Sequence, residues 1–252
     1  MGGLLADRVV LVTGGCRGLG QAIVDAFAAE GAQGAAVDLA GEVAAAAPPA
    51  GFAALAADVT DEASLAAAFA ATVERFGRLD IVVANSGLVP PWRETEALDL
   101  AEWDRVLAVN VRGVAATLKH AVPALKQQGG AIIAMASINA ETAHPRQMLY
   151  TASKHAVLGM VRAAALDLGR HGIRVNALAP GPVATAALLE RIRNRAARGG
   201  PDEAEALRLY AAETALGRIA TEAEIAATAV FLASDMASAI TGQVIPIDAG
   251  LP

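Results

Sequence analysis

A tyrosine and a lysine stand four residues apart in the stretch LYTASKHAV, residues 149–157. On a helix, Tyr150 and Lys154 would lie one above the other on the same face, so the phenol and the ammonium could converge on one point. A phenol beside a cation can exchange protons with a bound molecule. Because many ordinary helices carry Tyr and Lys at this spacing, the pair alone also allows a purely structural interpretation.

Seven apolar runs rich in Val and Ile alternate with stretches in which Ala and Leu recur at helical spacing. The predicted strands cover residues 8–13, 34–39, 52–58, 79–85, 130–137, 173–179 and 243–248. The predicted helices cover about 18–30, 61–76, 99–126, 150–170 and 221–233, and PPAG in the connection 40–52 allows only a short or broken helix. This alternation is typical of a parallel sheet covered on both faces. We therefore predict an α/β, doubly wound (Rossmann) fold with a seven-stranded parallel sheet, in a single domain over residues 1–252.

Composition and charge narrow the classes of function. Of the 252 residues, 55% are hydrophobic and 18% are charged, which is enough apolar material for a large core. The net charge of −6 offers no basic face for a nucleic acid, and no apolar run suggests a membrane span. No secretory signal is visible, and a single cysteine, Cys16, excludes an internal disulfide. We expect a cytoplasmic protein without a metal site, in which Cys16 is a small residue of a tight loop.

A glycine-rich loop, TGGCRGLG, follows the first predicted strand and precedes the first predicted helix. Gly14, Gly18 and Gly20 permit a tight turn and let the backbone approach a pyrophosphate, whose charge then lies at the helix N-terminus. The spacing differs from the common G-x-G-x-x-G pattern, so a glycine-rich turn without a ligand is the alternative.

An acidic residue, Asp38, closes the second predicted strand, where it can accept hydrogen bonds from the adenosine-ribose hydroxyls of a dinucleotide. Its carboxylate would repel a 2′-phosphate, which favours NAD as the cofactor. Arg17 argues the other way, because a cation beside the ribose could hold that phosphate, although it could also be solvated or paired with Asp38. Asp58 and Val59 close the third strand and could border the adenine.

Seven motifs in order resemble those of the classical short-chain dehydrogenase/reductase family. They are TGGCRGLG, DV at 58–59, NSG at 85–87, VNVRG with Asn110, Ser137, YTASK and RVNALAPGPVAT. The resemblance covers nearly the whole chain, with Ser86 as one departure where many members have Ala. It implies an oxidoreductase that moves a hydride between NAD(H) and a secondary alcohol or ketone.

The same resemblance assigns catalytic roles to Asn110, Ser137, Tyr150 and Lys154. Tyr150 would exchange the proton, Ser137 would position the substrate oxygen, Lys154 would hold the nicotinamide ribose and Asn110 would anchor a water in a proton relay. Lowering a phenol pKa from about 10 by roughly three units needs about 4 kcal/mol, and one ammonium at about 4 Å supplies energy of that order. Lys154 can therefore do most of this, helped by the positive charge of an oxidised nicotinamide.

Further residues are predicted to line the site. The cofactor-binding residues are Gly14, Arg17, Gly18, Leu19, Gly20, Asp38, Asp58, Val59, Asn85, Gly87, Tyr150, Lys154, Pro180, Gly181, Val183 and Thr185. The substrate-binding residues are Ser137, Asn139, His144, Gln147, Tyr150 and Trp92, with Leu88, Val89, Ile138, Met148 and Leu188 as apolar wall. His144 and Gln147 could equally belong to an exposed loop.

Residues from about 185 to 216 are predicted to form two short helices broken at GGP, and the resemblance implies a lid over the substrate. The first of these helices is rich in arginine, with Arg191, Arg193, Arg195 and Arg198. They could attract an anionic substrate, or form a solvated helix face.

The sequence thus predicts an NAD-preferring enzyme acting on a small or medium, mostly apolar alcohol or ketone. Two alternatives remain: an NADPH-dependent 3-oxoacyl carrier-protein reductase and a non-catalytic dinucleotide-binding regulatory protein. Helices 99–126 and 150–170 are apolar beyond one stripe, and the resemblance implies a homotetramer that uses them at an interface.

Overall fold

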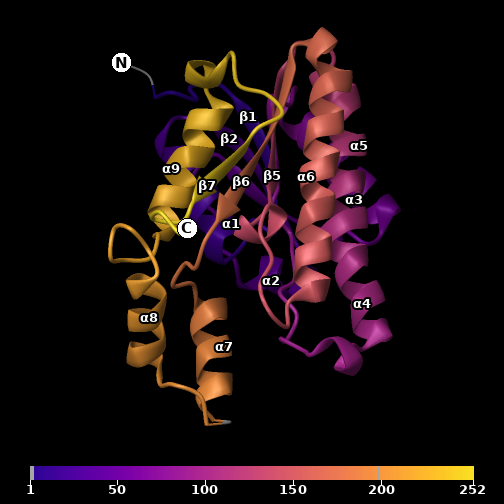
Figure 1. The fold of residues 1–252 in the computed structure, drawn as a ribbon. Coiled ribbons are helices and arrows are strands. Elements are labelled where there is room, and N and C mark those ends of the chain that lie inside the picture. The colour runs from indigo at the N-terminus through magenta and orange to yellow at the C-terminus, as the bar shows by residue number, and fades with distance from the viewer. Residues whose placement is uncertain (1–2, 198) are drawn as a thin grey trace.

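The computed structural model describes residues 3–197 and 199–252, and a seven-stranded parallel sheet forms its centre (Figure 1). The strand order is β3-β2-β1-β4-β5-β6-β7. The strands are β1 (Val9–Thr13), β2 (Gln33–Asp38), β3 (Phe52–Ala56), β4 (Ile81–Ala84), β5 (Gly130–Met135), β6 (Ile173–Pro180) and β7 (Val244–Ile247). The order reverses between β1 and β4, which confirms the predicted doubly wound sheet and marks its ligand-binding crevice.

Helices cover both faces of the sheet (Figure 1). They are α1 (Gly18–Ala29), α2 (Ala40–Ala45), α3 (Glu62–Phe76), α4 (Leu100–Leu107), α5 (Val114–Leu125), α6 (Met148–Leu168), α7 (Ala186–Ala196), α8 (Glu203–Ala212) and α9 (Glu222–Ala233). The sheet side chains alternate between two apolar clusters, one shared with α1 and α9 and the other with α3, α5 and α6. Strands β1, β2, β4, β5 and β6 are therefore buried on both faces, as expected for a parallel sheet, whereas the edge strands β3 and β7 are partly exposed.

The predicted helix 99–126 differs from the structure in one respect. It is divided into α4 and α5 by a π-helical segment, Ala108–Gly113, which carries the buried Asn110. Wider π turns of this kind are rare and occur mostly at functional sites. The segment also brings Gly113 so close to Val59 that an added Cβ would lie 2.8 Å from Val59 Cγ2. Apolar periodicity does not reveal such an interruption, because both flanking helices keep their buried faces.

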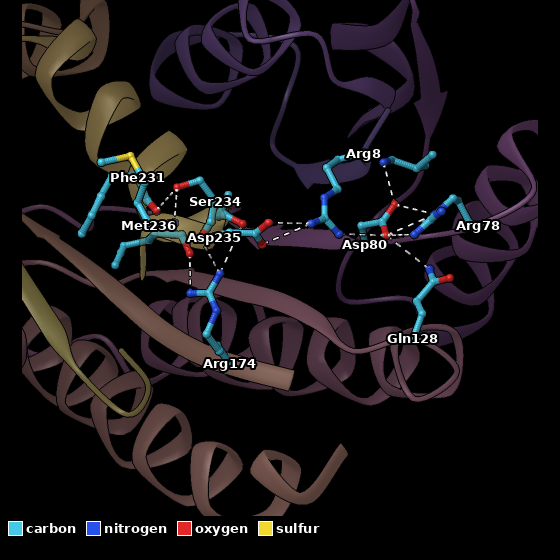
Figure 2. Close-up of polar contacts among 12 residues, drawn as sticks. Arg8, Arg78, Asp80, Gln128, Arg174, Phe231, Ser234, Asp235 and Met236 are labelled. Atoms are coloured by element: carbon cyan, nitrogen blue, oxygen red, sulfur yellow. Dashed lines mark hydrogen bonds and ion pairs between the residues drawn. The ribbon is translucent and has the colours of Figure 1, made fainter. Parts of the chain in front are cut away.

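A network of charged and polar groups joins elements at the amino end of the strands (Figure 2). Asp80, which is 1% exposed, accepts hydrogen bonds from Val9 N at 2.9 Å and from Arg78 Nε at 2.9 Å. Arg8 lies 3.8 Å from Asp80 and bonds Asp235 at 3.1 Å. We call the residues Arg8, Arg78, Asp80, Gln128, Arg174 and Asp235 the amino-end network.

Arg174 extends the network to the end of α9. Its guanidinium donates to the carbonyl oxygens of Leu232, Ala233 and Ser234 at 2.6, 3.2 and 3.1 Å. The Leu232 and Ala233 carbonyls lie at the end of α9 and carry the negative end of the helix dipole, so a cation stabilises them. Ser234 O also accepts a hydrogen bond from Ala237 N at 3.2 Å. No helix among residues 3–197 and 199–252 is long and apolar enough to cross a membrane.

Candidate active site

A cavity of about 720 Å³ lies at the opposite end of the sheet, beyond the carboxyl ends of the strands. Its wall includes every predicted cofactor-binding residue: Gly14, Arg17, Gly18, Leu19, Gly20, Asp38, Asp58, Val59, Asn85, Gly87, Tyr150, Lys154, Pro180, Gly181, Val183 and Thr185. Ser137 and the apolar residues Leu88, Val89 and Leu188 also line it. Residues that are far apart in the chain therefore meet in one space because the strands that precede them are parallel neighbours.

The glycine loop approaches this cavity with its backbone. Gly14 has a φ of +63°, and a Cβ added to Gly20 would lie 1.8 Å from the Gly14 carbonyl oxygen, so neither position suits a larger residue. Asn85 Nδ2 donates to the carbonyl oxygens of Thr13 and Gly14, each at 3.0 Å, and ties the loop to the end of β4. No side chain caps the N-terminus of α1, so its first N–H groups can bind a pyrophosphate. The loop fits a dinucleotide.

Asp38 and Arg17 lie on the same side of the cavity but do not pair. The Asp38 carboxylate accepts hydrogen bonds from Cys16 N at 3.2 Å and Leu39 N at 2.9 Å, whereas Arg17 pairs with Glu42 at 3.4 Å. Burial, followed by the charges of Asp38 and Glu42, raises the pKa of the Cys16 thiol to about 11. The thiol therefore stays protonated near neutral pH and is a poor nucleophile.

Tyr150 is half-buried near the start of α6, and its hydroxyl group faces opposing influences. The pKa of the Tyr150 phenol is raised, because burial outweighs hydrogen bonding by Ser137 and the charge of Arg191, both of which lower it. Ser137, 7% exposed, follows β5 and its Oγ accepts a hydrogen bond from Asn139 N at 3.3 Å. A phenol placed in this way can exchange a proton once another cation or ligand tips the balance.

Lys154 is 4% exposed and its Nζ donates to the Met135 carbonyl oxygen at 2.7 Å. The Nζ lies 5.6 Å from the centre of the Tyr150 ring. Burial lowers the pKa of Lys154 to about 8. The sequence predicted that Lys154 would do most of the lowering of the pKa of the phenol. In the structure the cation that lowers it is Arg191, which the sequence left as one of four equivalent arginines.

Asn110 is fully buried and does not line the cavity. Its Oδ1 accepts a hydrogen bond from Leu88 N at 2.7 Å, and its Nδ2 donates to Leu88 O at 2.8 Å and Ser153 Oγ at 3.2 Å. The side chain thereby joins the π-helical segment to the loop after β4 and to α6. Its proposed part in a proton relay stays a prediction.

Several predicted substrate residues lie outside the cavity wall. Asn139 Nδ2 donates to Gln147 Oε1 and Thr151 Oγ1, each at 3.1 Å. Trp92 lies between two arginines, with Arg195 at 4.7 Å and Arg146 at 5.9 Å from its ring centre. His144 is exposed, and Asn139, His144, Gln147, Trp92, Ile138 and Met148 form no part of the main cavity wall. Substrate binding by these residues stays a prediction.

Helices α7 and α8 pack against each other through Leu188, Ile192 and Ala206, and Thr185 Oγ1 caps α7 by accepting from Leu188 N at 3.2 Å. Two arginines of α7 have partners within this pair, because Arg193 lies 3.6 Å from Glu203 and Arg195 donates to Tyr210 Oη at 2.9 Å. Arg191 lines the cavity instead. Arg198, predicted with these arginines, lies outside the described residues.

Helical phase could have distinguished these arginines. Arg191 and Arg195 share a face with the buried Leu188 and Ile192, because they follow Leu188 by three and seven residues. Arg193 lies on the opposite side. Among the described residues there is also no cluster of three or more side chains that could hold a metal ion.

The fold and the glycine loop define a dinucleotide-binding α/β protein, and comparisons with known proteins identify its family. Residues 14–252 match the family model described as Enoyl-(Acyl carrier protein) reductase. The chain is 38% identical to levodione reductase of Leifsonia aquatica, over 97% of this chain and 94% of the relative. It is 37% identical to cis-4-hydroxycyclohexanecarboxylate dehydrogenase of Sinomonas cyclohexanicum, over 99% of this chain and 98% of the relative.

A solved structure agrees with these relatives. Carveol dehydrogenase from Mycobacterium avium, crystallised in complex with NAD, superposes with a TM-score of 0.90 at 30% identity, with 98% of each chain covered. The chain therefore belongs to the short-chain dehydrogenase/reductase family of oxidoreductases, whose members bind a nicotinamide dinucleotide.

Proposed function

We propose that this protein is an NAD-dependent dehydrogenase that interconverts a secondary alcohol and a ketone on a small or medium, mostly apolar substrate. The observation that carries the proposal is the presence of Ser137, Tyr150 and Lys154 on the wall of the same cavity as the glycine loop. The reaction transfers both a hydride and a proton. This cavity combines a glycine loop that would bind the hydride-carrying dinucleotide with side chains that would position the substrate and exchange its proton.

The chain's own residues would divide the work. A bound nicotinamide supplies the hydride donor or acceptor. Ser137 Oγ would hold the substrate oxygen, and Tyr150 would take its proton during oxidation or return it during reduction. Lys154, fixed by its bond to Met135 O, would bind the nicotinamide ribose and add positive charge beside the phenol.

The preference for NAD is supported by the surroundings of Asp38. The carboxylate lines the cavity, and the nearby Arg17 is paired with Glu42, which reduces its availability for a 2′-phosphate. The similarity to a carveol dehydrogenase solved with NAD agrees with this preference. Fluorescence titration with NADH and NADPH tests it: we expect tighter binding of NADH, and tight binding of NADPH alone would contradict the proposal.

The substrate class is supported by the apolar wall of Leu88, Val89 and Leu188 and by the names of two relatives. A screen with NAD and secondary alcohols would test it, with cyclohexanol and 4-hydroxycyclohexanecarboxylate among the first compounds. Reduced cofactor should appear with at least one alcohol. If no turnover is seen with either cofactor, NAD(H) or NADP(H), for any of the alcohols or the matching ketones, the protein is better explained as a non-catalytic dinucleotide-binding protein.

We also propose a homotetramer in the cytoplasm, a single functional domain and a lid formed by residues 185–216. Exposed apolar residues on α6, including Leu166 at 86% exposure, support a partner surface there. Size-exclusion chromatography with light scattering tests the assembly, and a monomeric mass would contradict it.

A further inference from the structure

Arg191 differs from the other arginines of α7 and α8 in its surroundings. Arg193 pairs with Glu203, Arg195 bonds Tyr210, and Arg208 bonds Glu205 at 2.7 Å. Among residues 3–197 and 199–252, no carboxylate lies within ion-pair distance of Arg191, and no hydrogen bond of its guanidinium is found. Its side chain is only half-exposed and lines the cavity.

A half-buried guanidinium without a partner carries a desolvation cost that an anion can offset. Burial lowers the pKa of Arg191, while the nearby Tyr150 and Tyr210 raise it. Arginine nevertheless keeps its charge in proteins, and its planar fork matches a carboxylate through two parallel hydrogen bonds. The side chain is therefore suited to a planar anionic group inside the cavity.

The location of Arg191 indicates which molecule would bring that group. Arg191 lines the same cavity as Ser137 and Tyr150, and its charge lowers the pKa of the Tyr150 phenol, which places it on the side of the reacting groups. The pyrophosphate of a dinucleotide would instead lie at the glycine loop and the N-terminus of α1. Leu188, one turn before Arg191 on α7, contributes apolar wall beside the cation.

We propose that the substrate is a hydroxy or oxo acid with an apolar body. Arg191 binds its carboxylate, while Tyr150 exchanges a proton with the oxygen of its hydroxyl or carbonyl group. This rests on the proposed dehydrogenase function. Arg191 thereby sets specificity from α7, because an acid that enters the cavity supplies the ion-pair partner that this arginine lacks among the described residues.

Binding can be measured apart from turnover with cyclohexanecarboxylate and its neutral amide, cyclohexanecarboxamide, which have similar shapes. With saturating NAD, calorimetry should show at least tenfold tighter binding of the acid to the wild-type protein. Arg191→Met should abolish that preference, Arg191→Lys should retain part of it, and Arg193→Met, on the opposite side of the same helix, should leave it unchanged. Thermal unfolding of each variant confirms that it is folded.

If the wild-type protein binds acid and amide equally, or if folded Arg191→Met keeps the preference, the proposal is wrong. A weakening of NADH binding in Arg191→Met, with the acid preference intact, would assign Arg191 to the cofactor instead. Because this test needs no turnover, it remains decisive even where every alcohol in the activity screen fails. Where 4-hydroxycyclohexanecarboxylate is oxidised, Arg191→Met should raise the KM for this acid at least tenfold more than it raises the KM for cyclohexanol.

Discussion

Charged groups gather at both ends of the central sheet, and the two ends satisfy them differently. At the amino end, Asp80 is bonded by Val9 N and Arg78, Arg8 links Asp235, and Arg174 bonds the last carbonyls of α9. At the carboxyl end, Lys154 has one bond to Met135 O and Arg191 has no ion pair among the described residues. At the amino end the charged groups pair with other groups of the chain, whereas at the carboxyl end they keep hydrogen-bond donors free for a ligand.

The difference teaches how stability and function are separated in this fold. A buried charge that is fully paired stabilises the native arrangement, and removal of its partner is costly. A buried charge that keeps free donors costs stability until a ligand arrives, which is typical of a binding site. Variants at the amino end should therefore lose stability, and variants at the carboxyl end should lose activity.

The largest effect is expected for Tyr150→Phe, which removes the proton-exchanging hydroxyl. Turnover of a confirmed substrate should fall by about 10²–10⁴, since general acid–base catalysis contributes on that scale. The midpoint of thermal unfolding should change little, because the hydrogen-bond partner of the phenol, Ser137, is another side chain of the cavity wall. Initial rates of NADH formation measure the effect, and wild-type turnover would show that Tyr150 is not the acid and base.

Asp80→Ala tests the amino end. Loss of the carboxylate leaves Arg78 and Val9 N without their buried acceptor, so the free energy of unfolding should fall by about 3–5 kcal/mol. Affinity for NADH should stay close to wild type at temperatures where the variant is folded. Urea denaturation gives the stability, and Asp25→Ala, at an exposed position on α1, is the control. A loss below about 1 kcal/mol would overturn the contrast between the two ends.

Lys154→Met should separate stability from activity in a pH-dependent way. The folded pKa of Lys154, about 8, lies below its ordinary value of 10.5, so the unfolded chain binds more protons between these values. Wild-type stability should therefore rise with pH across this window, while below pH 8 the buried charge is a cost. The variant should be more stable than wild type by about 1–2 kcal/mol at pH 7, after the lost bond to Met135 O is discounted.

That advantage should shrink as the pH rises from about 8 towards 10.5, and activity should be lost throughout. Urea denaturation of both proteins at several pH values, without cofactor, follows the change. Parallel stability curves for the two proteins would mean that Lys154 stays charged in the native state across this range.

The smallest effect is expected at Asp38, whose removal changes cofactor choice rather than chemistry. Asp38→Ala should reduce the ratio of kcat/KM for NAD to that for NADP by about tenfold, equivalent to about 1.4 kcal/mol. Its hydrogen bonds to Cys16 N and Leu39 N are also lost, so NAD binding itself should weaken. Steady-state kinetics with each cofactor provide the ratio, and an unchanged ratio would place the discrimination at another residue.

Sequence patterns predicted the fold with good accuracy because strand and helix periodicities are local. The seven strands appear where the apolar runs predicted them, although several end earlier: residues 57–58 and Asn85 lie beyond β3 and β4. Those residues leave the sheet at the point where they enter the cavity wall. Hydrogen bonding between strands ends before these residues. Hydrophobic patterns do not show this end, because the last paired residue and the first loop residue can be equally apolar.

The site was predictable to a different extent on its two sides. The residues predicted to bind the cofactor follow strand ends, which parallel topology brings together, so motif order sufficed to place them on one cavity wall. The substrate wall depends on how loops and the lid helices pack. Asn139 and Gln147 lie within three residues of Ser137 and Tyr150 in the chain, yet they bond each other and form no part of the main cavity wall. Proximity in sequence therefore does not establish which side chains line that wall.

The amino-acid sequence by itself determined the order of elements, the convergence of the strand ends and the helical alignment of Tyr150 with Lys154, because each follows from backbone periodicity. The tertiary structure alone decided that a π-helical segment carries Asn110 against Leu88. Helical phase separates Arg191 from Arg193, but only the tertiary structure decided that the side of α7 with Arg191 lines the cavity. Helix pairing is the physical reason. Burial of Leu188, Ile192 and Ala206 between α7 and α8 fixes the rotation of α7 about its axis. With that rotation, Arg191 is the arginine of α7 that lines the cavity.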